Sequence, residues 1–188
     1  LSRVNTLAKD VTENMDKFEL GIAVQKVYDF IWNEFCDWYI EMAKVRTYKK
    51  DEDPASANAA LWTLRTVLIQ SLKLLHPFMP FITEEIFCTL QSEEETIMLS
   101  DWPQYKPEWN FAEDEAAIEH CKDLVKGVRN VRTQMEVPPS RKAKLFIVSE
   151  DADVRAIFEK NREVYINLAF TSEIIVESDK CGIGEDAV

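Results

Sequence analysis

Residues 76–87 read HPFMPFITEEIF, a string in which two prolines interrupt an apolar run. Pro77 and Pro80 lack a backbone N–H, and their rings clash with the preceding turn of a helix, so the upstream helix must end near His76. Thr83 is then the expected N-cap of the next helix, because its hydroxyl can accept from an orphan N–H group. The string therefore predicts a corner between two helices.

The other polar side chains of this corner are also expected to be structural. Glu84 and Glu85 are expected in the first turn of the second helix, where the helix dipole favours acids. His76, beside a proline, is expected to be a helix-end partner or a satisfied core histidine rather than a proton-transfer group. Gly-rich phosphate loops, GxSxG and HExxH strings are absent from the sequence, so we predict no catalytic residue in this chain.

Upstream of the corner, apolar residues recur at helical spacing. One stripe predicts a long helix over about 19–48, a second predicts a helix over about 56–76, and another helix is expected before residue 18. The stripes are Leu20, Val24, Val27, Ile31, Phe35, Trp38 and Met42; Leu61, Leu64, Leu68, Leu72 and Leu75; and Val4, Leu7, Val11 and Met15. With a short helix over about 82–91, these segments predict an antiparallel bundle with short connections.

Downstream, residues 93–110 lose helical periodicity, and we expect a crossing loop that packs its aromatic side chains on the bundle. Residues 113–134 are again helical in pattern, and Pro138 and Pro139 end that element. Strand-like runs at 143–149 and 172–178 flank a helical segment at 153–168, which predicts a β-α-β unit.

The sequence therefore predicts a mainly α protein, an antiparallel helical bundle with a small C-terminal α/β subdomain. We expect residues 1–110 to form the bundle with its crossing loop, and residues 111–188 to form a basic helix and the β-α-β unit. Two strands are few for an independent sheet, so this second part is expected to be truncated.

Composition favours a protein of the cytoplasm that is not held in a membrane. Neither a signal peptide nor an 18-residue apolar run is present, and the four scattered cysteines form no CxxC pair, so we predict free thiols and no metal site. The formal net charge of -12 disfavours a nucleic-acid partner on average. The chain opens without methionine and is expected to be a piece of a longer protein.

The positive charge is concentrated locally. Residues 122–144 hold seven basic and two acidic residues, against 15 basic and 32 acidic elsewhere. Lys122, Lys126, Arg129 and Arg132 are spaced to lie on one helix face, and Arg141, Lys142 and Lys144 follow the two prolines. Solvated faces usually mix signs, so this pattern is consistent with phosphate binding as well as with an ordinary solvated face.

A second cationic group closes the long helix near three aromatic residues. Lys44, Arg46, Lys49 and Lys50 follow Trp38 and Tyr39 and surround Tyr48. The helix dipole favours cations at this end in any case, but aromatic side chains beside cations can also stack unpaired bases. Core packing is the favoured interpretation for Trp38, because it lies on the apolar stripe.

Four strings, in order along the chain, carry a resemblance to a known family. They are WNEFCDWYIEMAK at 32–44, the corner at 76–87, DWP at 101–103 and RNVRTQMEVPPSRKAKL at 129–145. The corner resembles the anticodon-binding helical domain of class I aminoacyl-tRNA synthetases. FCDWY and RxxRxxxxVPPSxK resemble the valyl members of that class in particular.

The resemblance implies a domain that follows the catalytic domain of its parent enzyme and binds the anticodon end of a valine-specific tRNA. The parent would use ATP to join valine to tRNA. This chain lacks the catalytic HIGH and KMSKS strings and the editing domain, and is expected to bind no cofactor itself. Its expected partners are the tRNA and the parent's catalytic domain. An isoleucyl-type relative and a helical protein-interaction module remain alternatives.

We therefore hypothesise that two groups of cations contact tRNA, the first along phosphates and the second near the anticodon. The first group is Lys126, Arg129, Arg132, Arg141 and Lys142, and the second is Lys44, Arg46 and Lys49.

Overall fold

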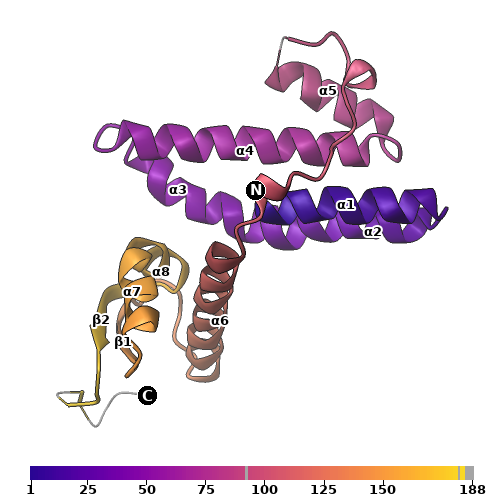
Figure 1. The fold of residues 1–188 in the computed structure, drawn as a ribbon. Coiled ribbons are helices and arrows are strands. Elements are labelled where there is room, and N and C mark those ends of the chain that lie inside the picture. Colours follow the sequence, from indigo (N-terminus) through magenta and orange to yellow (C-terminus); the bar gives the residue numbers. More distant parts are fainter. Residues whose placement is uncertain (92, 182, 185–188) are drawn as a thin grey trace. The chain divides into compact units, whose positions relative to one another are not determined.

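The computed structural model describes residues 1–91, 93–181, 183 and 184. The protein is mostly helical, with a small parallel sheet near the C-terminus, which confirms the predicted fold class (Figure 1). The chain divides into two compact units, Leu1–Ala112 and Glu113–Val188. Within the described part of the chain, no helix is both long enough and apolar enough to cross a membrane.

The first unit is an antiparallel set of helices joined by short connections. Its helices are α1 (Ser2–Asp16), α2 (Leu20–Asp29), the π-helix η1 (Phe30–Ile40), α3 (Glu41–Tyr48), α4 (Pro54–Leu75) and α5 (Pro80–Leu90). Two short 3-10 helices follow, η2 (Ile97–Leu99) and η3 (Pro107–Trp109).

The predicted long helix runs without a break from α2 through η1 to α3, but its middle is a π-helix. In a π-helix the hydrogen bonds run from i to i+5, so the turn is wider and residues four apart stay close to one side. Phe35 accordingly stacks on Tyr39 and is buried, as is Ala43 one further step along. The predicted stripe is therefore wrong in part, and Leu20 is nearly half exposed.

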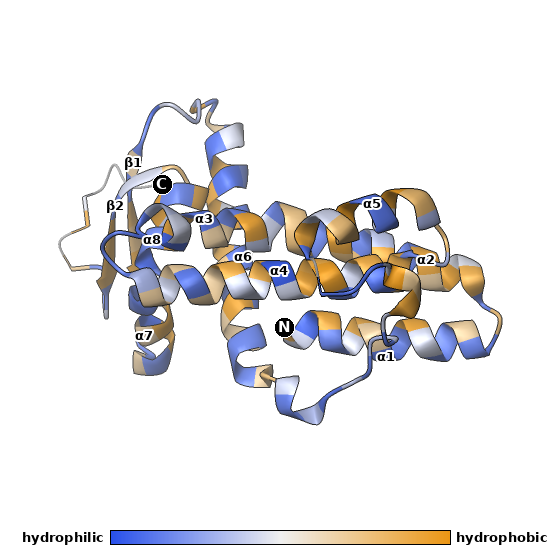
Figure 2. Cartoon of the chain, turned by 90° about the horizontal axis from the view of Figure 1, so that it is seen from above, coloured by the Kyte–Doolittle hydropathy of each residue, from blue (hydrophilic) through white to orange (hydrophobic). Residues whose placement is uncertain are grey.

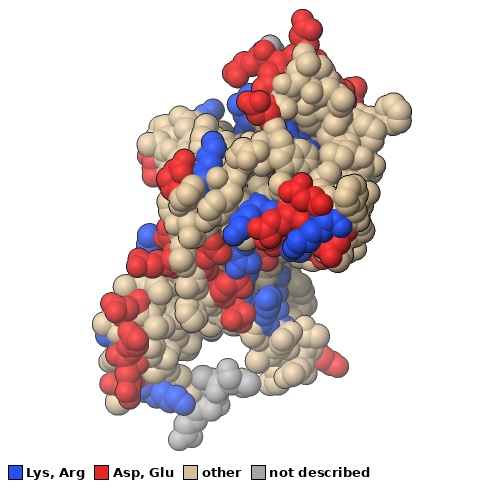
Figure 3. Space-filling view, turned by 45° about the vertical axis from the view of Figure 1, so that its right-hand side comes forward, with Lys and Arg blue, Asp and Glu red and all other residues tan. Residues whose placement is uncertain are grey.

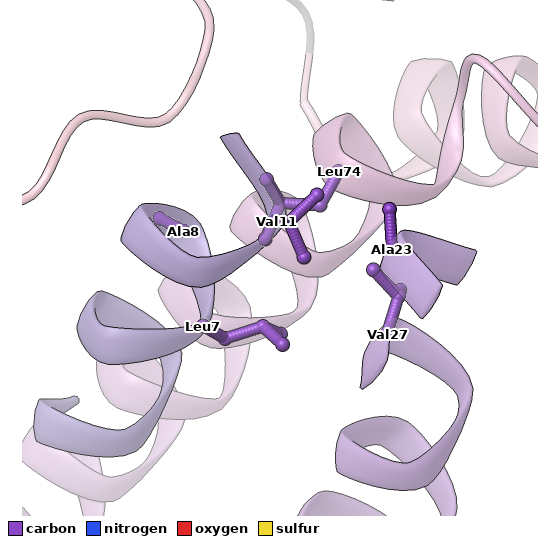
Figure 4. Packing of buried hydrophobic residues seen from close by; sticks show 6 residues of the cluster. All are labelled: Leu7, Ala8, Val11, Ala23, Val27 and Leu74. Atoms are coloured by element: carbon purple, nitrogen blue, oxygen red, sulfur yellow. The ribbon is translucent and has the colours of Figure 1, made fainter. Parts of the chain in front are cut away.

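Helix α4 packs against neighbouring helices on more than one side, whereas its single apolar stripe predicted one buried face. Leu74 joins α1 and α2 through Val11 and Ala23 in the cluster shown in Figure 4. Val67 packs instead with Phe35 and Val4, whereas Leu72 packs against α5. The predicted Leu61 is nearly half exposed, whereas Ala57 and Ala60 at the same end of α4 are fully buried.

The corner between α4 and α5 is present, but its predicted cap is wrong. Helix α5 begins at Pro80, with Met79 as the residue before it, and no acid lies in its first turn. Proline is favoured at the first helical position because the N–H that it lacks would have no partner there. Thr83 is therefore one turn inside the helix, where it is fully buried.

Thr83, which is buried, and His76, which is partly buried, form a polar pair at this corner. The Thr83 hydroxyl donates to the Met79 carbonyl at 2.8 Å, and Nδ1 of His76 lies 2.7 Å from the same oxygen. Since the hydroxyl proton is used, Nδ1–H of His76 is assigned as the donor to Thr83. The prediction of a satisfied histidine at a helix end is confirmed.

Glu84 connects α5 to the following loop instead of starting the helix. Its carboxylate accepts from the backbone N–H of Ile97 at 3.2 Å. Hydrogen bonding from the Thr96 hydroxyl, with smaller contributions that include this N–H, holds the pKa of Glu84 below its ordinary value. The ionised carboxylate thus helps to order the turn at η2.

The crossing loop packs on α1, as predicted. Trp102 Nε1 donates to Thr12 Oγ1 at 2.8 Å, and its ring packs against the Leu74 cluster. Asn5 makes two hydrogen bonds to the backbone of Lys106, of 2.8 Å and 2.7 Å. Backbone groups of this loop that have no partner in a helix or sheet are therefore hydrogen-bonded by side chains of α1.

The second unit contains α6 (Ala112–Gln134), β1 (Ala143–Val148), α7 (Ala152–Lys160), α8 (Arg162–Leu168) and β2 (Thr171–Glu177). The strands pair in parallel, with Phe146 opposite Ile175, which confirms the β-α-β prediction. The helical segment at 153–168 is split at Asn161 into two short helices. Tyr165, from the second of these, donates to Cys121 Sγ in the core at 2.5 Å.

Candidate nucleic-acid interface

The C-terminal end of α3 presents a cationic corner next to the start of α4. Lys44 Nζ donates to Glu41 at 2.6 Å, and this hydrogen bond raises the pKa of Lys44, so its ammonium stays charged. Arg46 Nε donates to Ser56 Oγ at 2.8 Å and thereby ties α3 to the first turn of α4. We call this surface, with Lys44, Arg46, Tyr48, Lys49 and Lys50, the cationic corner.

The position of Arg46 depends on how helix α4 begins. Asp53 caps α4 by accepting from the backbone N–H of Ser56 at 3.0 Å, and Pro54 occupies the first helical position. Both features are preferred at helix starts. The string DPAS at 53–56 was the signal for this cap, and it places Ser56 Oγ beside the guanidinium.

The cationic corner also offers one strongly exposed ring. The side chain of Tyr48 is 82% exposed, whereas Trp38 and Tyr39 are half-buried. Burial raises the pKa of Tyr39, whose hydroxyl pairs with Thr63, so this ring belongs to the bundle. Tyr48 is consequently the aromatic side chain of this group that is available for stacking.

The basic residues of α6 do not form the uniformly exposed face that their spacing predicts. Arg132 is buried, and its Nη2 donates to the carbonyl of Pro138 at 2.9 Å and to that of Arg141 at 2.5 Å. Arg129 Nε donates to the Leu168 carbonyl at 2.9 Å, and its guanidinium lies 5.6 Å from the centroid of the Phe170 ring. Both guanidinium groups therefore hold backbone of their own unit.

The geometry at the end of α6 explains why Arg132 binds these carbonyls. The helix ends in a Schellman motif, in which the N–H of Val137 bonds to the Arg132 carbonyl at 2.8 Å and Glu136 adopts a left-handed φ of 53°. The chain then turns back at Pro138 and Pro139. The carbonyls of Pro138 and Arg141 therefore face Arg132 in the last turn of the helix. The helix ends at Gln134, before the two prolines, and the Schellman motif rather than the prolines closes it.

Lys122, the first residue of the predicted stripe, is also buried and donates to Glu119 at 3.0 Å, whereas the remaining basic residues of this region lie at the surface. Arg141 and Lys142 are exposed in the segment that leads into β1. Lys126 is exposed on α6, 3.9 Å from Asp123, and Lys144 pairs with Glu173 across the two strands at 2.9 Å. On the face drawn in Figure 3, basic and acidic side chains are intermixed rather than gathered into one large patch.

Metal-binding and redox groups add nothing to this surface. Among the residues that the structure describes, no three His, Cys, Asp or Glu side chains are grouped as a metal ion would require. Cys36, Cys88, Cys121 and Cys181 are free thiols. The cationic corner is therefore suited to binding through its cations and the exposed ring of Tyr48.

Comparison with known proteins agrees with this picture. The family described as the anticodon-binding domain of tRNA ligase matches residues 1–147. The valine–tRNA ligase of Clostridium tetani is 48% identical over 193 residues, which cover 100% of this chain and 21% of the relative. That of Clostridium acetobutylicum is 46% identical with the same coverage, and that of Geobacillus stearothermophilus is 40% identical over 95% of this chain and 20% of its own. The chain thus spans about a fifth of the length of these relatives.

Proposed function

Because the chain belongs to the anticodon-binding domain family of tRNA ligases, we propose that it recognises the anticodon of a valine tRNA within a valine–tRNA ligase. The observation that carries this proposal is the 48% and 46% identity to two valine–tRNA ligases along the whole chain. In this proposal the catalytic part of the longer enzyme binds ATP and joins valine to the tRNA in the cytoplasm. This chain supplies recognition and positioning.

At the cationic corner, Tyr48 stacks on an unpaired base while Lys44, Arg46 and Lys49 neutralise the neighbouring phosphates. Base–aromatic stacking contributes about 1–3 kcal/mol per base, and single-stranded loops are the parts of RNA whose bases can be splayed out in this way. The Ser56 hydrogen bond fixes the stem of Arg46 in advance, which lowers the entropy lost on binding.

The second group of contacts is made by the exposed cations around the end of α6. Lys126, Arg141 and Lys142 hold phosphates, whereas Arg132 organises the turn on which two of them stand. Arg129 combines both roles, since one nitrogen is bound to the Leu168 carbonyl and its other nitrogens can still donate.

The test is fluorescence anisotropy of the 188-residue chain with valine tRNA, with the same tRNA carrying altered anticodon letters, and with isoleucine tRNA, each at two salt concentrations. Anticodon-dependent binding of the valine tRNA is expected. A preference for isoleucine tRNA would favour the isoleucyl alternative. Equal binding of all three tRNAs would contradict recognition of the anticodon.

Three matched triple variants separate the two contact groups. Alanine at Lys44, Arg46 and Lys49 should weaken binding and abolish the anticodon preference. Alanine at Lys126, Arg141 and Lys142 should weaken all tRNAs alike and reduce the slope of log K against log salt by about 0.7–0.9 per lost phosphate contact. The control, alanine at Lys9, Lys17 and Lys160, removes the same charge elsewhere and should leave the anticodon preference intact.

A further inference from the structure

Arg129 and Phe170 form a cation–ring pair at the end of α8. The Arg129 guanidinium lies over the Phe170 ring, 5.6 Å from its centroid, and Nε donates to the carbonyl of Leu168, the last residue of α8, at 2.9 Å. Arg129 is exposed, whereas Phe170 is half-buried. The ring therefore backs one side of the guanidinium, and the residue that carries the charge remains at the surface.

Phe170 has a backbone conformation that favours glycine. Its φ is 55°, in the left-handed region, where a Cβ is strained. Phe18, with a φ of 60°, closes α1 in the same conformation, in a Schellman motif in which the N–H of Glu19 bonds to the Asn14 carbonyl at 2.8 Å. After α8, the side chain of Arg129 adds a hydrogen bond to the last helical carbonyl. Strained residues cluster at binding sites, so the conformation of Phe170 is consistent with a role in binding.

Arg129 carries a charge that its own unit does not neutralise. Figure 2 shows hydrophilic and hydrophobic residues alternating along α6, as expected for a helix with one buried and one open face. Residues 124–135 contain no acid, and Arg129 forms no ion pair with any residue that the structure describes. Lys126, one turn earlier, lies 3.9 Å from Asp123. Among the described residues, the Nη groups of Arg129 have no hydrogen-bond partner, so four N–H donors remain unused.

A guanidinium held over a ring offers a plane that an ammonium lacks. Unpaired bases of RNA stack on aromatic rings and on arginine guanidinium planes, whereas a phosphate requires only charge and donors. The Nε hydrogen bond and the Phe170 ring hold this plane in place before binding, which lowers the entropy lost when a base stacks on it. A base inside a duplex has both faces covered by its neighbours. The pair is therefore matched to an unpaired base rather than to a helical stem.

We propose that Arg129 and Phe170 form a stacking site for one unpaired base of RNA. The inference rests on the proposed function, because it names a second base contact for the tRNA that this chain recognises there. The base lies on the open side of the guanidinium, and the unused Nη groups donate to the phosphate beside it. Arg141 and Lys142 are exposed in the same unit, and Arg132 binds the Arg141 carbonyl one turn along α6, so further cations lie along the same RNA backbone. Every base has a π-face, so this contact does not depend on the anticodon letters.

The first test observes the Arg129 side chain by NMR in the 188-residue chain. Oligoadenylate supplies bases and phosphates, whereas inorganic polyphosphate supplies the phosphates alone. The ring current of a stacked base should shift the Arg129 Cδ protons upfield with oligoadenylate and not with polyphosphate. No upfield shift with oligoadenylate, or the same shift with both probes, overturns the proposal. An equal shift at the same base concentration of adenosine monophosphate would also overturn it, because the site would then bind a free nucleotide.

The second test uses variants of the pair. Arg129→Lys removes the plane and keeps the charge, so it should weaken the binding of valine tRNA by at least about five-fold without changing the salt dependence. Arg65→Lys is the matched control, because Nε of Arg65 also donates to a last helical carbonyl, that of Leu90 at 3.3 Å, and the affinity should stay within about two-fold. Phe170→Gly removes the ring without strain, since glycine adopts the left-handed φ, and should weaken binding as well. Binding as tight as that of the parent chain by either variant of the pair overturns the proposal.

The two proposals fail separately. Changing the anticodon letters should weaken binding by the same factor in the parent chain and in Arg129→Lys. An anticodon effect without the upfield shift would refute the stacking site and leave the proposed function intact. The upfield shift without an anticodon effect would do the reverse.

Discussion

Arg132 gives the clearest test of what the basic residues of α6 do. Its spacing in the sequence predicts a phosphate contact, whereas in the structure it binds backbone carbonyls. The guanidinium donates to the carbonyls of Pro138 and Arg141, and it is 8% exposed. A hydrogen bond to a charged donor contributes about 1.5–3 kcal/mol. Both acceptors belong to exposed residues and can regain water, so we expect Arg132→Met to destabilise the second unit by about 2–4 kcal/mol.

The assay is native-state hydrogen exchange of the β1 amides, because the segment held by Arg132 leads directly into that strand. All five tryptophans lie in the first unit, so tryptophan fluorescence during chemical unfolding reports on that unit separately and should not change. Arg132→Lys keeps the charge but lacks the fork that reaches two carbonyls, so it should recover less than half of the loss.

Lys142→Ala is the matched control, since it removes a cation from the same turn without removing these hydrogen bonds. It should leave β1 exchange unchanged and weaken tRNA binding. The reasoning would be refuted if Arg132→Met left the exchange of β1 within about 0.5 kcal/mol of the parent chain, the range of an ordinary surface substitution.

Three further changes test the first unit by chemical unfolding monitored through tryptophan fluorescence. Thr83→Val keeps the shape of a fully buried side chain but leaves His76 without its partner, and it should cost about 1–3 kcal/mol, whereas the exposed Thr89→Val should be nearly neutral. Phe18→Gly should stabilise the isolated chain by about 1 kcal/mol by relieving the left-handed strain, and a loss of stability would contradict the cap assignment. Glu84→Gln should lower stability above the ordinary pKa of 4.5, where the parent carboxylate is ionised, and the difference should vanish as the pH falls through the lowered pKa of the folded state; a difference that grows in acid would reverse the assignment.

Much of the fold was predictable because its signals are local. The apolar period of α1, the two prolines at 77 and 80 and the alternation of helical and strand-like runs after residue 143 each act within a few residues. The cap at Thr83 was predicted wrongly because proline can begin a helix as well as end one, and Pro80 begins α5.

The candidate site was likewise predictable only in part. The cations at the end of α3 were predicted from their positions in the sequence. The helix dipole favours cations at this end, and the Asp53 cap begins α4 beside them. The roles of Arg129 and Arg132 were not predictable, because their partners are backbone carbonyls rather than side chains. Carbonyl groups are present in every residue, and no sequence pattern marks which of them will face a given arginine.

The order of residues was therefore enough to establish a mainly helical protein with a cationic corner and a family resemblance, since periodicity, proline positions and motif spacing are properties of the chain alone. Folding established which charges remain available to a partner and which apolar side chains remain uncovered. That division arises because burial and hydrogen bonding depend on contacts between segments far apart in sequence, such as Arg129 with Leu168 or Trp102 with Thr12.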